Sequence, residues 1–212
     1  MPLPETINHL LILLPSWVGD VVMSSCVWKM ARQKYPNAKI TGVIRPHLAP
    51  LLDGVDEFDA VLPLDMKTSV FTAAKQLRAA DGDAIVLLPN SFRSALIAKI
   101  AKIPVRAGYN RDWRSWLLTQ GVPVEQQNKP SPTGEYYLHL ANEMFEMNAQ
   151  PTLPSMGDCV SQHDALNEFS KPIVLLVAGA SKPEKRWDTR KFAEVADALS
   201  KMGATCCALG SP

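Results

Sequence analysis

The sequence predicts an α/β protein in which a complete, doubly wound parallel sheet is followed by the first part of a second sheet. Short apolar runs, typical of strands buried on both faces, alternate with amphipathic helical segments along residues 1–150. The same alternation restarts after an interval rich in proline, but it reaches only two strands by residue 212. We therefore expect a first domain over residues 1–150, a linker over residues 151–171 and an incomplete second domain over residues 172–212.

The expected strands of the first domain are continuous apolar runs that end at proline, asparagine or other turn-forming residues. In chain order they cover residues 10–14, 40–44, 60–64, 84–88 and 105–107. Between them, apolar residues that recur three to four positions apart predict helices. These helices cover residues 21–35, 48–52, 70–80, about 92–103 and 135–147, whereas residues 113–118 are ambiguous.

The second domain begins with another apolar run, which predicts a buried strand over residues 173–177. A helix is expected over residues 189–202 and a second strand over residues 205–209. That second strand would leave one edge without a neighbour, as expected where a sheet is incomplete.

Composition and charge exclude several classes of protein. The 212 residues include 22 basic and 21 acidic side chains, so bulk charge gives no reason to expect a nucleic-acid partner. The four cysteines, at positions 26, 159, 206 and 207, form no CxxC pair and no zinc spacing, which favours reduced thiols and no bound metal. No apolar run approaches the length of a transmembrane helix and no signal peptide is evident. We expect a cytoplasmic protein that could act peripherally at a membrane.

Two common nucleotide-binding fingerprints are missing. No two glycines are spaced as in G-x-G-x-x-G, and no G-x-x-x-x-G-K occurs. This argues against a nicotinamide-dependent dehydrogenase and against an ordinary P-loop ATPase.

The loop after the first strand, Ser16-Trp17-Val18-Gly19-Asp20, is the first candidate site. In open α/β sheets, ligands bind where strands end and helices begin. Gly19 would permit close backbone approach, and Asp20 is either the N-cap of the next helix or a general base at the mouth of a cleft.

A second candidate site is the segment 178–187, between the strand at 173–177 and the following helix. Its small residues Gly179 and Ala180 would let backbone N–H groups approach a phosphate, and Lys182, Lys185 and Arg186 could neutralise a diphosphate. The alternative is a basic surface loop whose helix is capped by Asp188 or Thr189.

Asn90 and Ser91 follow the strand at 84–88 and could either cap the next helix or bind sugar hydroxyls. Basic residues gather over residues 92–114 and 171–191, with Arg93 and Arg106 in the first stretch. They suggest an anionic ligand or, alternatively, solvated helix faces.

Several motifs, in order, resemble glycosyltransferase family 9. They are LLPSWVGDVV at 13–22, PNSFRSAL at 89–96 and RAGY at 106–109, followed by Gly179-Ala180, Lys185-Arg186-Trp187, Phe192-Ala193 and Leu209-Gly210-Ser211-Pro212. The resemblance implies a GT-B fold, in which two Rossmann-like domains face a cleft, the first binding the acceptor and the second the sugar nucleotide. It also implies a C-terminally truncated member, because the family pattern continues beyond these motifs.

The resemblance implies inverting, metal-independent transfer of heptose from ADP-heptose, a co-substrate, to the inner core of lipopolysaccharide. Carried onto this chain, Asp20 matches the general base, while Ser181 and Lys185 match positions beside the donor phosphates. The acceptor is an anionic lipid core at the inner membrane surface, for which we expect contacts from Ser16, Gly19, Asn90, Ser91, Arg93 and Arg106.

Two alternatives remain open at this point. The chain could be a non-catalytic remnant or acceptor-binding module of the same family. It could also be another glycosyltransferase that uses a different nucleotide sugar.

Overall fold

The computed structural model of the chain describes residues 2–124, 132–156, 169, 172–180 and 183–210. The chain divides into two compact units, Met1–Cys159 and Val160–Pro212. The division falls within the segment 151–171 that the sequence indicates as a linker. The first part of that segment packs on the first unit, because the Ser155 N–H donates to Ser25 Oγ at 3.2 Å.

The first unit is built on one six-stranded sheet with strand order β3-β2-β1-β4-β5-β6, in which every neighbouring pair is parallel. The central strands are the most apolar and the most buried, as the sequence predicts. The chain crosses from β1 to β2 on one side and returns to β4 on the other, so the strand order reverses at β1 and β4. The strands are β1 (His9–Leu13), β2 (Lys39–Ile44), β3 (Ala60–Pro63), β4 (Ala84–Leu87), β5 (Val105–Tyr109) and β6 (Gln120–Val122).

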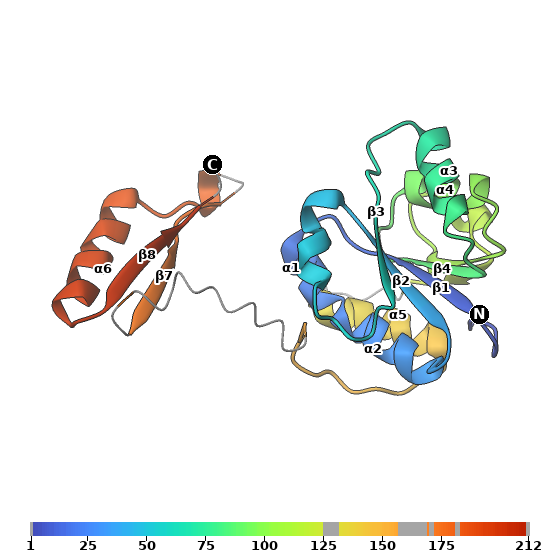
Figure 1. Cartoon of the computed structure of the whole chain (residues 1–212), viewed down its shortest axis with the longest axis horizontal. Coiled ribbons are helices and arrows are strands. Elements are labelled where there is room, and N and C mark those ends of the chain that lie inside the picture. Colours follow the sequence, from blue (N-terminus) through green and yellow to red (C-terminus); the bar gives the residue numbers. More distant parts are fainter. Residues whose placement is uncertain (1, 125–131, 157–168, 170–171, 181–182, 211–212) are drawn as a thin grey trace. The chain divides into compact units, whose positions relative to one another are not determined.

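Helices cover both faces of this sheet and enclose two separate hydrophobic cores (Figure 1). One face carries α1 (Val18–Met23), α2 (Ser25–Lys34), the 3-10 helix η1 (Pro46–Leu52) and α5 (Thr133–Phe145). The other face carries α3 (Val70–Ala79), α4 (Phe92–Ile100) and the 3-10 helix η2 (Ser115–Leu117). The doubly wound arrangement expected from the alternation of strands and helices is therefore present.

Two local features differ from the expectation. The single helix expected over residues 21–35 is two helices, because Ser24 turns its hydroxyl back to the Val21 carbonyl at 2.8 Å and separates α1 from α2. The short helix expected at 48–52 is present as the end of the 3-10 helix Pro46–Leu52, where Pro50 lacks the N–H that a regular α-helical ladder needs. Strand β6 was not expected, since its three residues show no apolar alternation; Gly121 pairs it with Gly108 of β5.

The second unit contains β7 (Ile173–Val177), the 3-10 helix η4 (Pro183–Lys185), α6 (Thr189–Lys201) and β8 (Thr205–Leu209). β7 and β8 pair in parallel, with Ile173 opposite Thr205. The burial expected for residues 173–177 is not found: Val177 is 65% exposed, and none of this unit's described residues is fully buried. A two-stranded sheet covered by one helix can bury only part of each strand.

Candidate functional site

A cleft of about 580 Å³ lies at the carboxyl ends of the first unit's strands, where the strand order reverses. Loops that follow five successive strands of the sheet contribute to its walls. The lining residues are Leu13, Leu14, Ser16, Arg45, Met66, Lys67, Pro89, Asn90, Ser91, Arg93, Ser94 and Asp112. Four of the six residues expected to bind an acceptor, Ser16, Asn90, Ser91 and Arg93, therefore lie together in one cavity.

Asp20 lies in the first turn of α1, shortly after the cleft residue Ser16, but is not among the residues that line the cleft. The N-cap of α1 is Trp17, so Asp20 is a first-turn residue and not the cap. Its half-buried carboxylate makes no hydrogen bond or ion pair with any described residue. It does act on the phenol of Tyr137, whose pKa is raised by burial first and by the negative charge of Asp20 second. A carboxylate that is not engaged structurally is available to accept a proton.

Gly19 is exposed within α1, and a Cβ atom placed there would meet nothing within 4 Å. The fold therefore does not require glycine at this position. An open surface beside Asp20 is what close approach of a ligand would need.

Asn90 is held at both ends of its side chain. Its Oδ1 accepts from Arg114 Nη2 at 3.1 Å, and its Nδ2 donates to Tyr136 Oη at 2.6 Å. Ser91 is the N-cap of α4, and its Oγ accepts the Ser94 N–H at 3.2 Å. The structure thus assigns capping to Ser91 and gives Asn90 a fixed orientation in the cleft wall.

The sequence reasoning did not single out Arg114, whose side chain is fully buried and holds this wall. Its guanidinium donates to the carbonyls of Tyr109 and Pro89 as well as to Asn90, and no carboxylate of a described residue hydrogen-bonds to it. Burial lowers the pKa of Arg114 to about 10. Gly108 makes room for it, since a Cβ there would lie 3.0 Å from Arg114 Nη2 and 2.9 Å from the Leu87 carbonyl oxygen.

Arg93 and Arg106 are both engaged by backbone carbonyls. Arg93 donates to Met66 and Thr68, which ties the start of α4 to the loop after β3 at the cleft wall. Arg106 donates to Ile103, Pro104 and Leu117. Arg106 lies in the first half of β5, opposite Ile85, and does not line the cleft. The structure therefore does not bring Arg106 together with the other expected acceptor residues.

Arg45 and Lys67 are cations in the cleft wall whose side chains have no hydrogen-bond partner among the described residues. Arg45 follows β2, and its Nε is buried with no acceptor in the described part of the chain. With Lys67 it also lines a second hollow of about 290 Å³. Burying a charged donor without a partner is costly, which makes Arg45 a strong candidate for an anionic ligand. Its position directly after a buried strand was the available sequence signal.

The phosphate-binding loop expected in the second unit is described only in part, because Ser181 lies outside the described residues. Lys185 is the last residue of η4 and is exposed, and its ammonium group makes no interaction with the described residues. Arg186 Nε donates to the Ala180 carbonyl at 2.8 Å and so closes the loop. Asp188 caps α6 by accepting the Arg190 N–H, which confirms one of the two expected caps.

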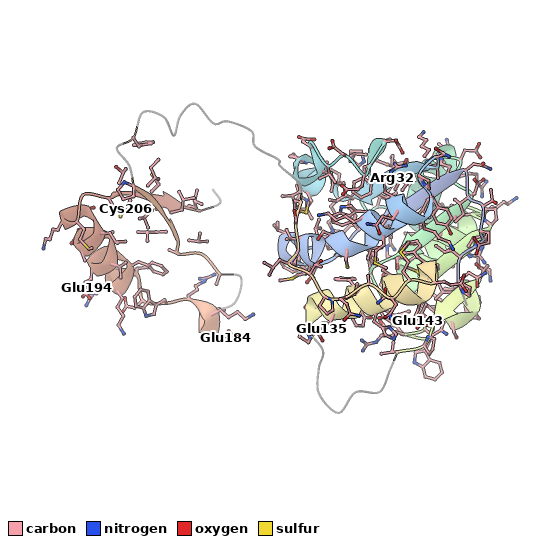
Figure 2. All side chains as sticks on the ribbon, turned by 90° about the horizontal axis from the view of Figure 1, so that it is seen from below. Arg32, Glu135, Glu143, Glu184, Glu194 and Cys206 are labelled. Carbon is pink, nitrogen blue, oxygen red and sulfur yellow. The ribbon has the colours of Figure 1, made fainter. Side chains whose placement is uncertain are left out.

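Figure 2 shows side chains of both units and labels carboxylates that lie on helices, including Glu135 and Glu143 of α5. Among the described residues, no group of three or more histidine, cysteine, aspartate or glutamate side chains could hold a metal ion. Within the same ranges, no helix is long and apolar enough to span a bilayer.

Comparison with known proteins adds the following. The model of glycosyltransferase family 9 (heptosyltransferase) matches residues 70–212. Lipopolysaccharide heptosyltransferase 2 of Salmonella typhimurium and that of Escherichia coli are each 29% identical to this chain over 95% of its length. The chain spans 63% of the length of these two relatives.

Solved structures agree on the fold. ADP-heptose lipopolysaccharide heptosyltransferase II of Escherichia coli has a TM-score of 0.80 at 29% identity, covering 96% of this chain and 64% of that one. A family 9 glycosyl transferase from Veillonella parvula has a TM-score of 0.81 at 18% identity, covering 97% and 63%. The predicted α/β fold class of the GT-B type is confirmed.

Proposed function

Because the chain belongs to glycosyltransferase family 9, we propose that it transfers heptose from ADP-heptose to the inner core of lipopolysaccharide. The observation that supports this most directly is the half-buried carboxylate of Asp20, which follows β1 and has no partner among the described residues. The relatives named as lipopolysaccharide heptosyltransferases support the acceptor class, and the solved ADP-heptose lipopolysaccharide heptosyltransferase II of Escherichia coli supports the donor. This chain spans 63% of the length of those relatives. The proposed activity therefore refers to an enzyme that has the full length of the relatives.

In the proposed reaction, Asp20 removes the proton from an acceptor hydroxyl as its oxygen attacks the anomeric carbon of the donor. The bond between that carbon and the ADP oxygen breaks on the opposite side, so the configuration at the anomeric carbon inverts. Lys185, together with the hydroxyl of Ser181, stabilises the negative charge that develops on the leaving diphosphate. With an ammonium group in this role, we propose that no metal ion is required.

The acceptor occupies the cleft of the first unit in this proposal. Asn90 offers a fixed amide beside Ser16, and such groups suit sugar hydroxyls. Arg45 and Lys67 would bind a phosphate or carboxylate of the acceptor core. Since the acceptor is a lipid, we also propose that the protein works at the cytoplasmic surface of the inner membrane.

The test is transfer from ADP-heptose to a heptose-bearing core acceptor, followed by mass spectrometry of the product. Asp20→Asn keeps the shape of the side chain but cannot act as a base, so we expect transfer to fall at least about a hundredfold while ADP binding is unchanged. Loss of transfer with a normal melting temperature supports the assignment. Full transfer by Asp20→Asn would refute the role of Asp20.

A matched pair of arginine variants tests the acceptor site. Arg45→Gln should raise the acceptor KM about tenfold or more with little change in stability, since its guanidinium has no hydrogen-bond partner among the described residues. Arg106→Gln removes the same charge but should lower stability and leave the acceptor KM unchanged. Equal effects on KM would contradict the placement of the acceptor in this cleft.

A second candidate function is an acceptor-binding module without turnover. The complete cleft in the first unit and the limited burial in the second unit favour it. Acceptor binding by the wild-type chain without any transfer, and without any ADP-dependent rise in melting temperature, would select this alternative.

A further inference from the structure

Helices α3 and α4 each expose a phenylalanine near the start of the helix and a lysine further along it. On α3, Phe71 and Lys75 are one turn apart, and both are exposed. On α4, Phe92 and Lys99 lie two turns apart on one stripe, and both are exposed. The two helices pack against each other over one hydrophobic core, so both stripes lie on the same side of the sheet.

The 3-10 helix η2 extends this surface with an indole ring. Trp116 lies beside Phe92, with ring centroids 6.0 Å apart. The ammonium group of Lys99 lies over the Trp116 ring, 4.4 Å from its centroid. Two of these large aromatic residues are mostly exposed to solvent: Phe71 is 75% exposed and Trp116 is 62% exposed. Neighbouring exposed aromatic residues on a folded surface indicate contact with a partner.

The charge of this face is uniformly positive along both helices. Neither α3 nor α4 contains an aspartate or glutamate, whereas together they contain Lys75, Arg78, Arg93 and Lys99. The nearest carboxylates in sequence belong to loops at the helix ends, and that of Asp83 accepts the N–H groups of Asn8 and His9. An anionic partner would therefore meet no carboxylate on either helix.

We propose that this α3–α4 face, defined by Phe71, Lys75, Phe92, Lys99 and Trp116, docks the protein on an anionic lipid bilayer. Aromatic rings prefer the boundary between headgroups and acyl chains, and lysine side chains reach anionic headgroups from the same depth. The inference rests on the proposed function, because an enzyme whose acceptor is a membrane lipid must reach the bilayer surface.

The position of the face relative to the cleft fits this role. Phe92 and Arg93 are consecutive, and Arg93 lines the cleft of the first unit. Docking through Phe92 would therefore hold the cleft wall close to the headgroups. A lipid-linked sugar could then reach the cleft without leaving the membrane.

The experiment measures co-sedimentation of the full chain with vesicles of phosphatidylcholine, with and without phosphatidylglycerol. We expect binding only to the anionic vesicles, and weaker binding as salt increases. The variant Lys75→Glu/Lys99→Glu should reduce binding at least about tenfold. The control variant Lys29→Glu/Lys39→Glu makes the same charge change on α2 and β2, away from this face, and should bind as the wild type does.

A second variant separates the aromatic contribution and guards against misfolding. Phe71→Ser/Trp116→Ser changes two largely exposed side chains, so its melting temperature should stay close to that of the wild type. We expect its vesicle binding to fall roughly tenfold. Equal binding by this variant, by the charge variant and by the control would overturn the proposal, as would equal binding to neutral vesicles. Competition by single-stranded DNA that depends on the same residues would instead indicate a nucleic-acid surface and also overturn it.

Transfer to a soluble, deacylated acceptor distinguishes this proposal from the proposed function. If the face only docks the protein, both variants should keep wild-type transfer to the soluble acceptor and lose it only with acceptor in vesicles. Vesicle binding through this face without any transfer would support the docking surface and refute the enzymatic function. Transfer without vesicle binding would support the enzymatic function and refute the docking surface.

Discussion

Replacing Arg114 with methionine should destabilise the first unit by about 3 kcal/mol. The wild-type guanidinium donates to the carbonyls of Tyr109 and Pro89 and to the amide oxygen of Asn90, and makes a longer bond of 3.4 Å to Ser94 Oγ. Hydrogen bonds to a charged group contribute about 1.5–3 kcal/mol each, so the three shorter ones together contribute roughly 4.5–9 kcal/mol.

The cost of burying the charge offsets part of this gain. Burial lowers the pKa of Arg114 to about 10, which corresponds to roughly 3 kcal/mol against the charged form. The remaining stabilisation is therefore between about 1.5 and 6 kcal/mol, and methionine restores some packing in the vacated volume.

The assay is urea denaturation followed by circular dichroism, with Arg114→Lys and Asn90→Ala as companion variants. Lysine keeps the charge but cannot reach all three acceptors, so we expect an intermediate loss of about 1–2 kcal/mol. If Arg114 holds Asn90 in the cleft wall, the losses for Asn90→Ala and Arg114→Met should be non-additive by at least about 0.5 kcal/mol. Strict additivity, or a loss below about 1 kcal/mol for Arg114→Met, would refute the reasoning.

Three further predictions follow from local environments. Gly19→Ala should raise stability by about 0.5–1 kcal/mol, because a Cβ there meets nothing, yet it should weaken substrate binding, as calorimetry with the acceptor would test. Burial raises the pKa of Cys26 to about 11, so iodoacetamide labelling of Cys26, mapped by mass spectrometry, should accelerate roughly a hundredfold when urea unfolds the chain. Burial, with Glu5 and Glu146, raises the pKa of Tyr35 to about 12, so the unfolded chain loses this proton first and stability should fall between about pH 10 and pH 12. Tyr35→Phe should remove about 2 kcal/mol of that decline in denaturation curves.

Most of the fold could be predicted because its strands are buried on both faces. The run His-Leu-Leu-Ile-Leu of β1 and the run Ala-Ile-Val-Leu of β4 have no other stable location in a chain of this composition. β6 could not be predicted, because Gln120 and Gly121 show no apolar pattern and their position depends on pairing with β5. The break at Ser24 depends on one hydroxyl that bonds to its own helix, which periodicity does not detect.

The candidate site was predictable in place but only partly in chemistry. Loops that follow buried parallel strands must meet at one edge, so Ser16, Asn90 and Ser91 were expected together, and they line one cleft. Whether Ser91 caps a helix depends on the position of one N–H group, which the sequence leaves open. In the structure its Oγ accepts the Ser94 N–H at 3.2 Å, and Ser91 also lines the cleft.

The arginines show that charge counting along the chain does not distinguish cations bonded by the fold from unbonded ones. Arg93 and Arg106 belong to the most basic segment, but backbone carbonyls occupy both guanidinium groups. Arg45 belongs to no basic segment, yet it lines the cleft with a buried Nε that has no acceptor among the described residues. A guanidinium already bonded by the fold has fewer N–H groups left for an anion, whereas an unbonded one can offer all of them. The anionic group of the acceptor should therefore select Arg45, the residue that charge density along the sequence gives least reason to choose.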